Sequence, residues 1–108
     1  MSAIATVYAV FGSHDEAERI GRAMIDTRLA ACVNILGPAQ SLYRWQGAVE
    51  QAKEVPALFK TSAGLAERLI AEIAAMHSYD VPAVCQWPIE RAAPGYLDWV
   101  LAETGAAE

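Results

Sequence analysis

The chain has 108 residues and a formal net charge of −5, with 55% hydrophobic and 19% charged residues. This length fits a single domain, residues 1–108, and the apolar share is high enough to suggest contacts between subunits. Lys and Arg form no cluster, which argues against nucleic-acid binding because a phosphate backbone requires several basic contacts on one face.

The beginning of the sequence gives no sign of export. Residues 1–10 lack the basic start and long apolar core of a signal peptide, and no apolar run is long enough to span a membrane. We therefore expect a cytoplasmic protein without a membrane partner. Its two cysteines are then expected to be free thiols.

Residues 4–11 are rich in β-branched and aromatic side chains, which predicts a central strand buried on both faces. Gly12 ends this strand. Ser13 and Glu16 have the spacing of a capping box, and the apolar residues that follow recur at helical spacing. The sequence therefore predicts a first helix that runs to about Arg28.

Residues 28–61 predict one long, bent β-hairpin. Apolar and polar residues alternate before and after an interruption at Gly37-Pro38, and Gln46-Gly47 marks the turn. Pro56 lacks a backbone donor and is expected at an edge or a bulge. The outer half of such a hairpin would expose the wide apolar surfaces of Tyr43 and Trp45, so we expect a homo-oligomer.

The rest of the chain predicts two helices and a strand. Ser62 can cap a second helix, whose continuation Pro82 prevents. Residues 84–87 read as a short strand stopped by Pro88, and a last helix is expected from Pro94 to near Gly105.

This order of elements is the split βαβ pattern of an α+β, ferredoxin-like βαββαβ sandwich with a long bent hairpin and an extra C-terminal helix. Both crossover helices should lie on one side of an antiparallel sheet. The opposite face then needs the C-terminal helix or another subunit to cover it.

The chain contains eight short segments that are informative when taken together. In order, they are RLAACVNI at 28–35, SLYRW at 41–45, Glu54, Lys60-Thr61, HSYDVP at 77–82, Pro88-Ile89, Tyr96-Leu97 and Trp99. Together they resemble the CutA divalent-cation tolerance family. The resemblance implies a compact homotrimer with strand pairing between subunits, a single CutA-like domain over residues 1–108, and a link to copper and other divalent cations.

Cys32, His77 and Glu54 are the candidate metal ligands. A thiolate suits Cu(I) or Zn²⁺, whereas a buried cysteine can equally serve as a small hydrophobic residue. Cys32 and Cys85 fall on opposite edges of a ferredoxin-like sheet, about 14 Å apart at about 4.8 Å per strand, so they cannot share an ion within one chain. His77 ends the second helix, where hydrogen bonding is the alternative to ligation.

A second set of residues is rich in aromatic side chains and could line a ligand cleft. Its alternative role is in the core or at a subunit interface. Lys60 ends an apolar strand, where it would need an anionic partner such as Glu54 or a ligand carboxylate, or would point outward. The cleft candidates are Tyr43, Trp45, Lys60, Tyr79, Asp80, Tyr96 and Trp99.

Three functional classes follow from these residues together with the resemblance, which implies the trimer and the link to copper. The leading one is a non-enzymatic, homotrimeric protein that binds copper or another divalent cation in clefts between subunits and has no organic cofactor. The second is a small-molecule-binding regulator that holds an anionic metabolite in an aromatic cleft with Lys60 and Glu54. The third is an enzyme with a Cys32–His77 pair, which no local nucleophile motif, phosphate loop or zinc signature supports.

Overall fold

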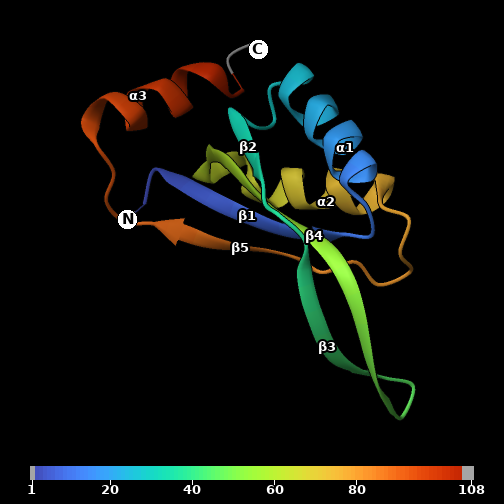
Figure 1. Ribbon diagram of the computed structural model, residues 1–108. Coiled ribbons are helices and arrows are strands. Elements are labelled where there is room, and N and C mark those ends of the chain that lie inside the picture. Colours follow the sequence, from blue (N-terminus) through green and yellow to red (C-terminus); the bar gives the residue numbers. More distant parts are fainter. Residues whose placement is uncertain (1, 106–108) are drawn as a thin grey trace.

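Strand β1 (Ile4–Phe11) lies in the middle of the sheet, between β4 (Ala48–Ser62) and β5 (Val84–Ile89), and is antiparallel to both (Figure 1). The computed structural model describes residues 2–105. Every residue of β1 is buried except Tyr8, which is half-buried. The prediction of a central strand covered on both faces is therefore confirmed.

The long hairpin is also confirmed. Strands β2 (Cys32–Ile35) and β3 (Ala39–Trp45) both pair with β4. Gln46 and Gly47, which join β3 to β4, have positive φ angles of 50° and 84°, as a type I′ turn requires. Ile35 pairs with Ala57 and Ala39 with Glu54, so residues 36–38 face residues 55–56. Pro56 thus lies at an irregularity in the pairing, as expected for a residue without a donor.

Helices α1 (His14–Asp26) and α2 (Ala66–Met76) cover one face of the sheet, and α2 follows a 3₁₀ turn at Ala63–Leu65 (Figure 1). The Ser13 hydroxyl accepts a hydrogen bond from the Glu16 amide at 3.1 Å, which confirms the predicted cap. The core between the layers is apolar. Its fully buried side chains include Val7, Phe11, Ile20, Phe59, Leu69 and Ile73.

Two local predictions were wrong, and the end of α1 lies two residues before the expected position near Arg28. Ser62 does not cap α2; its hydroxyl bonds that of Thr104, and the 3₁₀ turn separates it from the helix. Helix α1 ends at Asp26 because Arg28 adopts a positive φ of 61°. Strand β5 continues through Pro88, which an edge strand tolerates because one side of the strand needs no donor.

The face of the sheet opposite α1 and α2, here called the open face, is covered only in part. Helix α3 (Pro94–Glu103) lies over one end of it, where Val100 packs with Ile4 and Ala31. Paired residues point to the same side of a sheet, so the register defines two rows across the rest. One row is Cys32, Lys60, Thr6 and Trp87, and the next is Asn34, Leu58, Tyr8 and Cys85.

The strand order β2-β4-β1-β5, with β3 on the extended arm of β4, matches the predicted ferredoxin-like sandwich with a long hairpin and an extra C-terminal helix. Within residues 2–105, no helix has the length and apolar character to cross a membrane.

Candidate functional site

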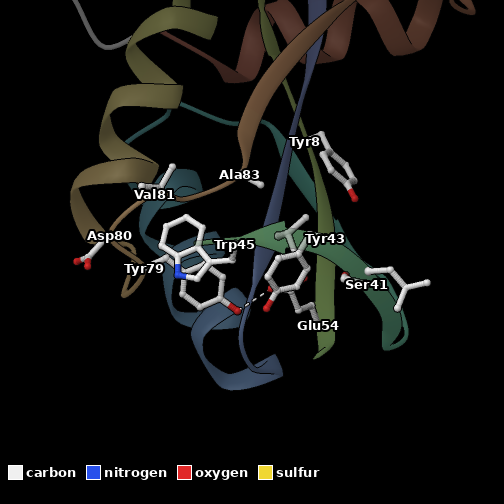
Figure 2. Close-up of a pocket in the computed structure, with 11 residues that line it drawn as sticks. Tyr8, Ser41, Tyr43, Trp45, Glu54, Tyr79, Asp80, Val81 and Ala83 are labelled. Atoms are coloured by element: carbon white, nitrogen blue, oxygen red, sulfur yellow. Dashed lines mark hydrogen bonds between the residues drawn. The ribbon is translucent and has the colours of Figure 1, made fainter. Parts of the chain in front are cut away.

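A cavity of about 650 Å³ lies where the hairpin meets β1 and the segment that follows α2; we call it the aromatic pocket (Figure 2). A volume of this size is ordinary for a small-molecule site. Its residues come from four stretches of the chain that are distant in sequence. They are Tyr8, Val10, Ser41, Leu42, Tyr43, Trp45, Glu54, Tyr79, Asp80, Val81 and Ala83.

His77 fixes the segment that carries Tyr79 and Asp80. Its fully buried ring stacks on Phe11 with ring centroids 5.0 Å apart. Nε2 lies 2.7 Å from the Val10 carbonyl oxygen, and the Tyr79 amide donates to Nδ1 at 3.1 Å. Since a carbonyl only accepts and an amide only donates, Nε2 carries the proton. Both ring nitrogens are therefore engaged in holding the wall of the pocket.

Glu16 secures the same segment from α1. Its carboxylate accepts hydrogen bonds from the Ser78 amide at 2.8 Å and the Ser78 hydroxyl at 3.0 Å. Burial alone would raise the pKa of Glu16, but the two bonds from Ser78 and the neighbouring His77 outweigh it, so the pKa is lowered. The start of the segment is thus held by a charged group.

Tyr79 and Glu54 join the two walls of the pocket. The Tyr79 hydroxyl donates to Oε2 of Glu54 at 2.8 Å, the bond drawn in Figure 2. Burial, together with this hydrogen bond and the charge of Glu54, raises the pKa of Tyr79 to about 12. The phenol therefore stays protonated and able to donate over the whole physiological pH range.

A separate group of predicted residues lies toward the end of the open face that α3 covers. The Cys32 thiol and the Tyr96 hydroxyl are 3.5 Å apart, and the rings of Tyr96 and Trp99 are 5.9 Å apart. Burial and the Cys32 hydrogen bond raise the pKa of Tyr96 to about 12. Lys60, which pairs with Cys32 in the sheet, donates to the Asn34 amide oxygen at 2.7 Å.

The structure therefore divides the predicted cleft in two. Tyr43, Trp45, Glu54, Tyr79 and Asp80 line the aromatic pocket. Lys60, Tyr96 and Trp99 are absent from its lining and belong with Cys32. The anionic partner expected for Lys60 is not Glu54, because six residues of strand at about 3.3 Å each separate them by about 20 Å.

The predicted metal ligands do not meet within one chain. Residues 2–105 contain no group of three or more His, Cys, Asp or Glu side chains placed to hold an ion. Cys32 and Cys85 are free thiols on strands at opposite ends of the order β2-β4-β1-β5. Ligation by His77 would break one of its two hydrogen bonds, and Cys32 contacts Tyr96 rather than His77.

Sequence reasoning missed six of the eleven residues that line the pocket. Tyr8 carries a usable signal, since it is a polar aromatic residue inside an otherwise apolar strand. The others carry none, because small and aliphatic residues acquire a role here only through the bend of the hairpin. The missed residues are Tyr8, Val10, Ser41, Leu42, Val81 and Ala83.

Comparisons with known proteins agree with this geometry. Residues 5–103 match the family model described as CutA1 divalent ion tolerance protein. The divalent-cation tolerance protein CutA of Archaeoglobus fulgidus is 40% identical over 94 residues, which cover 87% of this chain and 91% of that protein.

Two solved structures are similar along almost their whole length. The divalent cation tolerance protein of Thermus thermophilus gives a TM-score of 0.90 at 37% identity, covering 94% of this chain and 99% of the other. CutA1 of Oryza sativa gives 0.93 at 32% identity, covering 98% and 97%.

Proposed function

Because the chain belongs to the CutA1 divalent ion tolerance protein family, we propose that it acts in divalent-cation tolerance as a homotrimer that binds metal ions between its subunits. The family match over residues 5–103 carries this proposal. The role is one of binding, without catalysis. Copper is the ion we favour, because the Cys32 thiolate suits Cu(I).

The uncovered surfaces of the chain support an oligomer. Leu42 and Val49 on the hairpin are 69% and 67% exposed, and Trp87 on the open face is 44% exposed. Within the part of the chain that the structure describes, strand β3 pairs with β4 alone, so its other edge presents unpaired backbone donors and acceptors. Exposed apolar side chains beside a free strand edge are typical of a surface that a second chain covers.

The separation of the metal-ligand candidates supports a site shared between chains. Glu54 lies in the aromatic pocket and Cys32 lies beside α3, so these two candidate ligands of one chain cannot bind the same ion. Metal sites in proteins usually require three or four ligands. A cleft between subunits can combine a thiolate of one chain with carboxylates of another, and His77 joins such a site only after releasing Val10 or Tyr79.

Equilibrium dialysis against Cu²⁺ and Zn²⁺, with copper also supplied as Cu(I) under reducing conditions, tests these ligands. We expect Cys32→Ala and Glu54→Gln to lower the number of ions bound per chain. Cys85→Ala and Glu50→Gln are matched controls on the same protein and should bind as the wild type does. Unchanged uptake in both Cys32→Ala and Glu54→Gln would refute the proposed ligands.

The aromatic pocket favours a second candidate function, that of a regulator that binds a small molecule. The observation behind it is a cavity of about 650 Å³ whose walls combine aromatic rings with a hydrogen-bonded carboxylate. This function predicts that a small organic compound raises the melting temperature while copper and zinc do not.

A further inference from the structure

The walls of the aromatic pocket carry negative charge and no positive charge. Two carboxylates line it, Glu54 and Asp80, and among residues 2–105 no Lys, Arg or His belongs to its lining. Glu54 lies at the Tyr79 hydroxyl, whereas the carboxylate of Asp80 points away from that bond (Figure 2). Lys60, the cation expected beside Glu54, instead bonds Asn34 about 20 Å along the strand.

The aromatic rings give the same electrostatic preference. Tyr8, Tyr43, Trp45 and Tyr79 all line the cavity, and the faces of such rings carry partial negative charge. Aromatic rings beside a carboxylate attract a cation in two ways, through the quadrupole of each ring and through the negative charge of the carboxylate. Within a single chain, Tyr43, Trp45 and Tyr79 are each between 37% and 45% exposed, so in the proposed trimer a ligand would reach them at the cleft between subunits.

The residues of a single chain suit neither a bare metal ion nor an anion in this pocket. A small ion requires several closely spaced donors, and residues 2–105 of one chain provide no group of three His, Cys, Asp or Glu side chains placed to hold it. An anion would face the Glu54 carboxylate, and the lining formed by the described residues holds no basic side chain to balance that charge. A bulky cation with an apolar surface would contact the aromatic rings, pair its charge with the Glu54 carboxylate and fill the cavity.

We propose that the aromatic pocket binds an organic cation with a quaternary or tertiary ammonium group, placed against Glu54 and enclosed by the rings of Tyr43, Trp45 and Tyr79. This proposal rests on the second candidate function and replaces the anionic metabolite with a cationic one. Tyr79 acts as a positioning residue, because its hydroxyl holds the Glu54 carboxylate at the wall.

Isothermal titration of the full chain with benzyltrimethylammonium tests the proposal. Its uncharged counterpart with a tert-butyl carbon in place of the nitrogen, and benzoate as an anion, are titrated in parallel. We expect the cation to bind at least about tenfold more tightly than the other two, the size of a desolvated cation–π and charge contribution. Equal or tighter binding of either comparison compound would overturn the cation assignment.

Variants locate the binding. Glu54→Gln and Trp45→Leu should each weaken binding of the cation about tenfold or more, while Glu50→Gln, on the same exposed strand but outside the pocket lining, should not. A thermal melt of each variant establishes that it is folded. If the folded Glu54→Gln variant and the folded Trp45→Leu variant both bind the cation as tightly as the wild type, the site lies elsewhere and the proposal is refuted.

The outcomes separate the two levels of inference. If benzoate or the neutral compound binds as tightly as the cation, and Trp45→Leu weakens that binding, the preference for a cation is refuted but the small-molecule pocket stands. If none of the three compounds binds, both the preference for a cation and the small-molecule pocket are refuted. Cosedimentation with phosphatidylcholine vesicles distinguishes the sources of the ammonium group, because pelleting with vesicles assigns it to a lipid headgroup and its absence assigns it to a free metabolite.

Discussion

The hydroxyl of Tyr79 donates to Oε2 of Glu54 at 2.8 Å, and this bond ties the segment after α2 to the arm of β4 that carries the hairpin. Two parts of the chain separated by 25 residues in sequence are thereby held at one pocket. The pocket therefore depends on a tertiary contact and not on a local motif.

Replacing Tyr79 with Phe should lower the free energy of unfolding by about 1 kcal/mol, because the ring is kept and one hydrogen bond to a charged group is lost. Urea denaturation measures this change. Tyr43→Phe is the control, since it removes a hydroxyl from the same pocket but leaves the Tyr79–Glu54 bond in place. Equal losses in the two variants would contradict a specific role for Tyr79.

Tyrosine ionisation gives a second prediction. The pKa values of Tyr79 and Tyr96 are raised to about 12, so both side chains should still be largely protonated at pH 11. A titration of tyrosinate absorbance measures this, and Tyr79→Phe should remove one of the two late-ionising groups. Because their folded pKa exceeds the ordinary value of 10.0, their contribution to stability is complete below pH 10 and is lost as the pH rises through 12.

Glu16 should make the free energy of unfolding depend on pH under acidic conditions. Its folded pKa is below the ordinary value of 4.5, so its contribution is complete above that pH and is lost as the pH falls through the folded pKa. Glu16→Gln should flatten this part of the curve of unfolding free energy against pH. The exposed Glu72→Gln is the control, and a curve for Glu16→Gln with the wild-type slope would contradict the role of the Ser78 bonds.

His77→Ala should lower the unfolding free energy by about 3 kcal/mol, because it removes a buried ring and leaves the partners of both nitrogens without their bonds. His14→Ala, at an exposed site, should change it little. Metal uptake by folded His77→Ala separates a structural histidine from a ligand: unchanged uptake shows that the ring serves the fold alone.

The sequence predicts much of this fold because alternation, turn residues and caps act locally. The hairpin with its Gln46-Gly47 turn and the Ser13 cap are examples. The prediction that Pro88 stops the last strand was wrong, because the effect of a proline depends on where the strand lies in the sheet. Whether β5 is an edge strand follows from the assembled topology and not from its own residues.

The candidate site was predictable only in part. Glu54 and Tyr79 were identified by residue type, yet Lys60 was grouped with them although six strand residues place it about 20 Å from Glu54. Strand spacing could have separated these two. No local pattern could show that His77 uses both ring nitrogens, since its partners lie on β1 and two residues ahead.

Native mass spectrometry of the metal-stripped protein, followed by titration with copper and zinc, tests the central claim most directly. We predict a trimer that takes up ions in multiples of three, because three equivalent clefts would each bind the same number. A monomer, or a trimer that takes up no fixed number of ions, would contradict metal binding between subunits.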